Sequence, residues 1–132
     1  MSVIVLDTDV ASAILRHRAP ASIGRHVAGN IPAITFVTIG ELTKWTLVRK
    51  WGPRSLGSMQ AFLSGLVVLP YDHRVARQWG ELQAHAQLRG RPRPINDSWI
   101  AACCLTRDLP LATFNIKDYA DFVEHEGLIL LS

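Results

Sequence analysis

The sequence has very little cysteine, and this excludes two classes of small protein. Its 132 residues contain only Cys103 and Cys104, which are adjacent inside an apolar run. Neighbouring positions on a helix do not face each other, so the pair predicts neither a disulfide framework nor a zinc site. We expect both to be small buried core residues, because free cysteine is among the most frequently buried residue types.

Long hydrophobic runs and a leader pattern are also lacking. No apolar stretch approaches the roughly 20 residues that span a membrane, and the N-terminus has no basic segment followed by an apolar one. These two features predict a cytoplasmic protein with no membrane contact. Apolar residues make up 48% and charged residues 19% of the chain, which is typical of a globular protein, and the length predicts a single domain over residues 1–132.

The order of elements is set by the first apolar run, Val3 to Leu6, which leads directly into Asp7. Such a run suits a strand buried on both faces of a parallel sheet. The segments that read as strands are 3–6, 31–37, 66–69, 111–113 and 128–131. The segments with helical features are 8–16, 20–29, 38–51, 54–64, 72–88, 96–105 and 115–122. Their alternation predicts an α/β fold with helices on both faces of a mainly parallel sheet of four to five strands.

Four carboxylates are expected near the carboxyl ends of the strands, where such a sheet binds its ligands. Asp7 ends the first strand, Glu41 and Asp97 lie in first turns of predicted helices, and Asp118 follows the strand at 111–113. Each has a simpler alternative role: a helix cap for Asp7, a capping box with Thr38 for Glu41, a helix-dipole contact for Asp97 and a solvated turn for Asp118.

As a set, the four acids indicate a divalent-metal site. Mg²⁺ and Mn²⁺ prefer hard oxygen ligands, and clustered carboxylates repel one another when no cation is present. The pattern fits metal-assisted hydrolysis of a phosphodiester. Arg89, Arg91 and Arg93 lie shortly before Asp97 and could hold phosphates beside the metal. The net charge of +3 and the pI near 9.2 are weak support for a nucleic-acid partner.

Four segments resemble the motifs of PIN-domain ribonucleases, and the likeness is greatest to VapC-type toxins of bacterial toxin–antitoxin pairs. The segments are Leu6-Asp7-Thr8, Thr38-Ile39-Gly40-Glu41-Leu42, Asn96-Asp97-Ser98-Trp99-Ile100-Ala101-Ala102 and Thr113-Phe114-Asn115-Ile116-Lys117-Asp118-Tyr119. The resemblance implies a PIN-domain-like three-layer α/β/α fold and a Mg²⁺- or Mn²⁺-dependent endoribonuclease activity. It also implies a VapB-type antitoxin partner and a homodimer within a larger toxin–antitoxin complex.

The resemblance also implies roles for individual residues. Asp7 and Asp97 would be the main metal ligands, and Glu41 and Asp118 would complete the acidic quartet directly or through water. The polar residues Thr113 and Asn115 would belong to the same site. The chain departs from the family pattern at two positions. Asp9 stands where many relatives carry Asn and adds a fifth possible acid, and Tyr119 stands where Phe is usual, a change we expect to matter little.

Two alternative functions fit parts of the sequence. Val3 to Val10 also resembles the first motif of haloacid-dehalogenase-like phosphohydrolases, in which Asp7 would be the nucleophile and Asp9 the acid. The chain is short for that fold and has no convincing later Ser/Thr-then-Lys motif. The second alternative, a non-catalytic RNA-binding PIN module, has no need for clustered acids. Transfer, ribosomal and messenger RNA all remain open as substrates.

Overall fold

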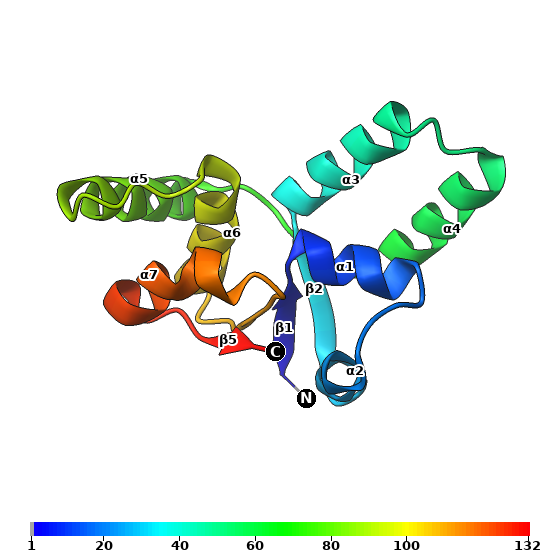
Figure 1. Ribbon diagram of the computed structural model, residues 1–132, viewed down its shortest axis with the longest axis horizontal. Coiled ribbons are helices and arrows are strands. Elements are labelled where there is room, and N and C mark those ends of the chain that lie inside the picture. Colours follow the sequence, from blue (N-terminus) through cyan, green and yellow to red (C-terminus); the bar gives the residue numbers. More distant parts are fainter. Residues whose placement is uncertain (1) are drawn as a thin grey trace.

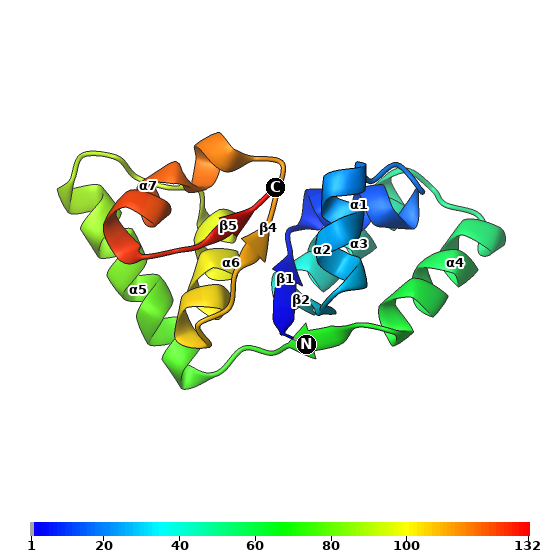
Figure 2. The same ribbon diagram turned by 90° about the horizontal axis from the view of Figure 1, so that it is seen from below.

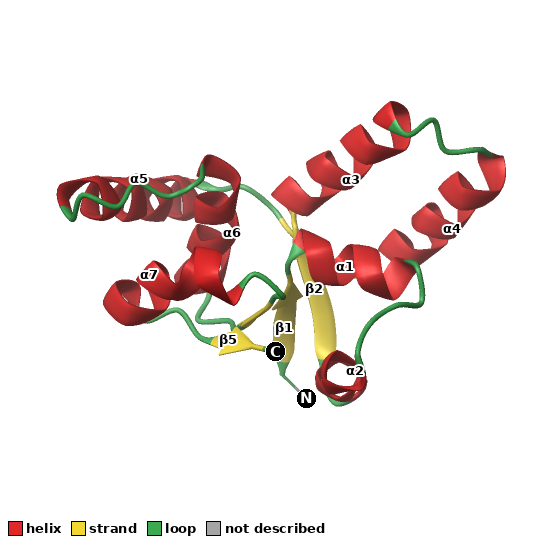
Figure 3. Ribbon diagram, viewed as in Figure 1, coloured by secondary structure: helices red, strands yellow, loops and turns green. Residues whose placement is uncertain are grey.

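The computed structural model describes residues 2–132, over which seven helices alternate with five strands (Figure 3). The strands are β1 (Val3–Leu6), β2 (Ile31–Thr35), β3 (Val67–Leu69), β4 (Leu111–Ala112) and β5 (Leu130–Leu131). The helices are α1 (Thr8–Leu15), α2 (Ala21–Ala28), α3 (Phe36–Val48), α4 (Pro53–Ser64), α5 (His73–Leu88), α6 (Ile95–Thr106) and α7 (Ile116–Glu126). Every strand and helix that the sequence pattern predicted is present, with small differences in length.

The five strands form one sheet with the order β3-β2-β1-β4-β5, and all neighbouring strands are parallel. The first strand of the chain is therefore the central one. The ladder between β1 and β4 continues one residue past β1, because the Asp7 amide donates to the Ala112 carbonyl at 2.9 Å. This arrangement confirms the predicted α/β/α fold with a parallel sheet.

Both faces of β1 are buried, as its apolar run predicted. Ile4 and Leu6 point into a core shared with Val10 and Ile23, so α1 and α2 cover one face of the sheet. Val5 points into a second core, which includes buried residues of α5, α6 and α7. Figures 1 and 2 show these two groups of helices on opposite sides of β1.

Helix α6 lies at the centre of the second core. Five consecutive residues, Ile100 to Cys104, are buried on it, which is the behaviour expected of a helix that is apolar nearly all round. Cys103 and Cys104 are both free and fully buried. Burial raises the pKa of the Cys103 thiol to about 11 and that of the Cys104 thiol well above its ordinary value. The prediction that both are core residues is confirmed.

The start of α3 differs from the prediction. The helix begins at Phe36, inside the segment predicted as strand, because Phe36 and Val37 pack on the second core. Its N-cap is Thr35, whose side chain makes no capping hydrogen bond. The predicted capping box of Thr38 and Glu41 is therefore wrong, since Thr38 lies inside the first turn, and this frees both side chains for other contacts.

Helices α3 and α4 extend from the carboxyl end of β2 as an arm that projects away from the sheet (Figure 1). The arm exposes apolar side chains near the end of α3, where Leu47 is 73% and Val48 68% exposed. None of the helices in the described chain combines the length and apolarity that crossing a bilayer requires.

Candidate active site

Asp7 and Thr113 directly follow the two neighbouring strands β1 and β4. The strand order runs outward from β1 in both directions, so the carboxyl ends of β1 and β4 form the switch point at which open α/β sheets bind ligands. The topology alone therefore places the Asp7 side chain at the mouth of the predicted site.

Three donors hold the carboxylate of Asp7, which is buried. Its Oδ1 accepts from the Thr8 amide at 2.9 Å and from the Tyr119 hydroxyl at 3.2 Å. Its Oδ2 accepts from the Thr113 hydroxyl at 2.7 Å. The Thr8 contact makes Asp7 the N-cap of α1 as well, so the capping role and the site role coexist. Burial, and then the charge of Glu41, raise the pKa of Asp7 against the lowering effect of these hydrogen bonds.

Asp97 lies in the first turn of α6 and faces Asp7 across the Tyr119 hydroxyl. That hydroxyl donates toward Asp97 Oδ1 at 3.3 Å as well as toward Asp7. Burial, and then the negative charges of Asp7 and Asp118, raise the pKa of Asp97 to about 6. The two main predicted ligands therefore meet at one buried phenol and repel each other.

Glu41 and Asp118 lie around this inner pair. Glu41 Oε1 accepts from the Thr8 hydroxyl at 2.8 Å, while Asp118 is exposed in the first turn of α7. The charges of both raise the pKa of Asp97, so the structure brings the four predicted acids into one region. Among residues 2–132, no three acidic, histidine or cysteine side chains are already grouped so that they could hold a metal ion.

The threonine and asparagine of the fourth motif behave differently from each other. Thr113 is fully buried, and its hydroxyl both donates to Asp7 and accepts from the Asn115 amide at 3.0 Å. Asn115 thus supports the site through its backbone. Its side chain is exposed and makes no capping bond to α7.

Asp9 is the fifth possible acid that the sequence indicated, and Tyr119 is the site neighbour whose importance sequence reasoning missed. Asp9 Oδ2 accepts from the Phe114 amide at 3.3 Å, while its Oδ1 is buried without a hydrogen-bond partner. Burial, and then the charge of Asp7, raise the pKa of Asp9 to about 6. Tyr119 contacts both main acids. The signal was present in each case, because both positions carry a more polar group than the family pattern.

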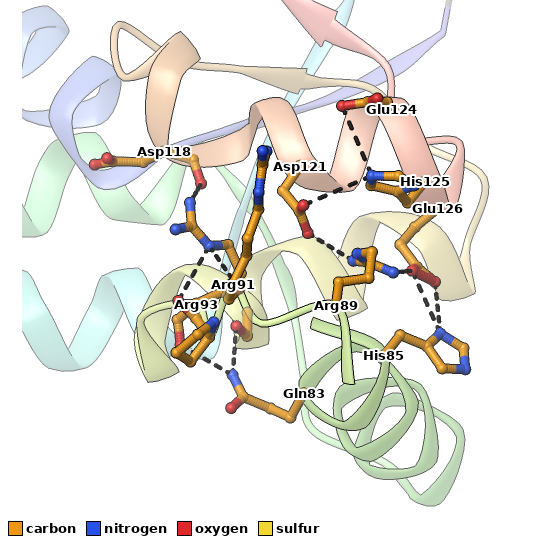
Figure 4. A network of polar contacts seen from close by, with 12 residues as sticks. Gln83, His85, Arg89, Arg91, Arg93, Asp118, Asp121, Glu124, His125 and Glu126 are labelled. Atoms are coloured by element: carbon orange, nitrogen blue, oxygen red, sulfur yellow. Dashed lines mark hydrogen bonds and ion pairs between the residues drawn. The ribbon is translucent and has the colours of Figure 1, made fainter. Parts of the chain in front are cut away.

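The three arginines expected to hold phosphates also separate. Arg89 pairs with acids of α7: its guanidinium donates to Asp121 at 2.6 Å and to Glu126 at 3.2 Å (Figure 4). The charge of Arg89 is therefore paired within the protein, and its contact with phosphate stays a prediction. Arg91 is exposed, and Arg93 donates to the backbone carbonyl of Asp118 at 3.5 Å, at the edge of the site (Figure 4).

We call the acids around the Tyr119 hydroxyl the site cluster, which consists of Asp7, Asp9, Glu41, Asp97 and Asp118. Within the described range of 2–132, none of them forms an ion pair with a basic side chain. The donors are all hard oxygens, one buried oxygen has no partner, and the carboxylates raise one another's pKa. This donor set fits a divalent cation.

Residues 4–122 match the family model of the PIN domain. This chain belongs to the PIN-domain family. Ribonuclease VapC5 of Mycobacterium tuberculosis is 32% identical to it over 111 residues, which cover 83% of this chain and 80% of that protein. The tRNA(fMet)-specific endonuclease VapC of Shigella flexneri is 28% identical over 117 residues, 87% of this chain and 88% of that protein.

The fold is also similar to that of a VapBC complex. The structure of VapBC-1 from nontypeable Haemophilus influenzae matches with a TM-score of 0.84 at 23% identity, over 100% of this chain and 98% of that one. The family match and the similar ribonucleases confirm the VapC-type ribonuclease that the four motifs indicated. They leave the dehalogenase-like alternative without support.

Proposed function

We propose that this PIN-domain ribonuclease is a divalent-metal-dependent endoribonuclease, with Mg²⁺ or Mn²⁺ bound at the site cluster. The observation that carries the proposal is the inner pair. Asp7 and Asp97 approach a single buried hydroxyl, and no basic side chain in the described chain pairs with either. A cation between two such carboxylates relieves the repulsion that raises their pKa values.

Asp7 and Asp97 would hold the metal directly. Glu41 and Asp118 would reach it through water, since Mg²⁺ usually keeps several waters and binds one or two carboxylates. When bound, such a cation lowers the pKa of a coordinated water and neutralises charge on a phosphate oxygen. Asp9 is a fifth candidate, because its buried Oδ1 has no other partner.

The chain's own residues orient these acids. Thr113 and the Thr8 amide fix the carboxylate of Asp7. The single hydroxyl proton of Thr8 goes to Glu41, so the 2.8 Å contact between Thr8 and Thr38 requires Thr38 to donate. This short relay aims Glu41 at the site from α3. Asn115 holds Thr113 through its amide, and Arg91 and Arg93 would contact RNA phosphates on the α7 side.

The test of this function is cleavage of RNA by the purified chain with Mn²⁺ and with excess chelator. We expect cleavage only with metal, products that end in a 5′-phosphate and a 3′-hydroxyl, and no covalent intermediate. Activity in chelator, or an aspartyl-phosphate trapped on Asp7, contradicts the proposal. Transfer RNA is the first substrate to test, because the Shigella flexneri relative is named for it. Messenger and ribosomal RNA are the comparison substrates.

The partner we propose is a VapB-type antitoxin, as the likeness to the VapBC-1 structure supports. One cavity, of about 370 Å³, has a mainly apolar lining that includes Ile14 and Val27. A second cavity, of about 460 Å³, has a mixed lining in which Leu15 and Trp51 lie beside basic and hydroxyl side chains. An amphipathic segment could dock there while an arginine pairs with the free carboxylates of the site cluster.

Inhibition should then need both parts of the antitoxin, the apolar anchor and the cation. An antitoxin cut after its DNA-binding half should neither bind the chain nor silence cleavage. If the truncated antitoxin does both, the occlusion model is wrong.

We further propose that residues 1–132 form one PIN domain, that the chain acts as a homodimer within the toxin–antitoxin complex, and that it meets its RNA in the cytoplasm.

A further inference from the structure

The hydroxyl of Tyr119 lies at the one point where the two inner acids meet. Tyr119 is fully buried in the first half of α7, and its ring packs against Phe122 with 6.5 Å between the ring centroids. The hydroxyl is 3.2 Å from Asp7 Oδ1 and 3.3 Å from Asp97 Oδ1. A buried, stiff phenol cannot move its oxygen far, so it holds a fixed position between the two carboxylates.

The two acids depend on this contact to different degrees. Asp7 also accepts from Thr8 and Thr113. For Asp97, the Tyr119 hydroxyl is the one hydrogen-bond donor among the residues that the structure describes. Both distances exceed the usual 2.5–3.0 Å of an O–H···O bond, as expected when one proton serves two acceptors. Tyr119 therefore determines where Asp97 points without binding it tightly.

The contact also determines which oxygens remain open. A carboxylate oxygen has about two acceptor positions. Asp7 Oδ1 already has two donors and Asp7 Oδ2 has one, so its open position is on Oδ2. Among the described residues no donor contacts Asp97 Oδ2, and this oxygen of the half-buried Asp97 is accessible to solvent.

We propose that Tyr119 is a positioning residue for the cation: it holds Asp97 and Asp7 by their Oδ1 atoms and leaves their Oδ2 atoms for the metal. This inference rests on the proposed metal site. It assigns a role to one of the two positions at which this chain departs from the family pattern. Contacts that orient metal ligands strongly affect metal affinity. Loss of the Tyr119 hydroxyl should therefore weaken metal binding about tenfold.

The experiment is Mn²⁺ titration of the full chain by calorimetry, without RNA. Tyr119→Phe removes one oxygen and keeps the ring, and Tyr71→Phe is the matched control, because Tyr71 is an exposed tyrosine elsewhere in the chain. We expect about tenfold weaker Mn²⁺ binding for Tyr119→Phe and wild-type binding for Tyr71→Phe. Equal or tighter binding by Tyr119→Phe overturns the inference while leaving the metal site intact. Failure of the wild type to bind Mn²⁺ overturns the metal site and this inference together.

A second measurement separates positioning from simple packing. In metal-free protein, a double-mutant cycle of Tyr119→Phe with Asp97→Ala reports the coupling of the two groups through the unfolding free energy. We expect the effect of Tyr119→Phe to be smaller once Asp97 is gone. Strict additivity means that the hydroxyl does not act on Asp97, and the inference is then wrong even if Mn²⁺ binding has changed.

Discussion

Helix α7 contributes to two acidic clusters. They differ in whether a basic side chain of the protein pairs with the acids. At its first turn Asp118 joins the site cluster, and Tyr119 contacts two further members of it. Farther along the same helix, Asp121 and Glu126 form what we call the paired cluster, which Arg89 joins from the end of α5 (Figure 4). In the paired cluster the positive charge comes from the protein, whereas the site cluster contains none.

The pKa values of the acids follow this difference. Burial alone would raise the pKa of Asp121, but the hydrogen bond and charge of Arg89 outweigh it and hold that pKa below its ordinary value. Burial also raises the pKa of Asp97, and the charges of the neighbouring acids raise it further. A buried carboxylate with its own arginine is a structural element. One surrounded by other carboxylates is a candidate site for an external cation.

The largest expected effect comes from neutralising one acid in each cluster. Asp97→Asn should reduce RNA cleavage by on the order of 100-fold or more, because a charge that faces the proposed metal is lost. Asp121→Asn should leave cleavage unchanged at temperatures where the variant is folded. Cleavage assays with Mn²⁺, together with circular dichroism, measure both. Full activity of Asp97→Asn, or inactivity of folded Asp121→Asn, would remove the distinction between the clusters.

The reverse pattern is expected for stability when the arginine is removed. Arg89→Met removes the arginine partner of the buried Asp121 and the partly buried Glu126 and leaves them only histidine contacts, so the melting temperature should fall by on the order of 5 °C. Arg91→Met, two residues away and exposed, is the matched control and should melt with the wild type. Thermal unfolding in chelator measures the difference. Equal melting temperatures for the two variants would mean that the ion pairs of Arg89 do not stabilise the fold.

The contrast between the clusters also shows which parts of the molecule the sequence could predict. The alternation of apolar strands and helices determined the fold, and the chain order placed Asp7, Glu41, Asp97 and Asp118 near one another. Side-chain partners were harder to predict. Arg89 and Asp121 are 32 residues apart, so nothing in the local sequence indicated that Arg89 pairs with an acid. Tyr119 looked like a neutral replacement for Phe, because only the folded chain brings its hydroxyl to Asp7, 112 residues away.

Opposite pH dependences are expected for the two clusters in metal-free protein. Asp9 and Asp97 have folded pKa values of about 6, above the ordinary 3.8. Their contribution to stability is therefore complete below about pH 4 and is lost as the pH rises through about 6. Asp121 has a lowered pKa, so its contribution is present above the ordinary value and is lost as the pH falls through the folded one.

Denaturant unfolding in chelator, at several values between about pH 4 and pH 7, tests this dependence. Relative to Asp97→Asn, the wild type should lose about 1 kcal/mol across that range, a figure reduced for solvent screening of a partly exposed group. Asp121→Asn should differ from the wild type by a constant amount across this range, because the contribution of Asp121 is already complete above its ordinary pKa. Parallel curves for all three proteins would show that the clusters do not differ in charge state.

The smallest expected effect is on RNA affinity. It tests whether Arg89, which pairs with acids of the protein, also contacts RNA. Arg93→Gln should weaken RNA binding a few-fold and lower the salt dependence by about one ion, because Arg93 lies beside Asp118 and forms no ion pair among the described residues. Arg89→Gln should change neither quantity, since its guanidinium faces Asp121 and Glu126. Both variants are best measured in the Asp97→Asn background, so that RNA stays intact, over a series of salt concentrations below the unfolding temperature. If Arg89→Gln lowers the salt slope as much as Arg93→Gln does, the ion pair opens for RNA. The paired cluster would then be part of the RNA-binding surface.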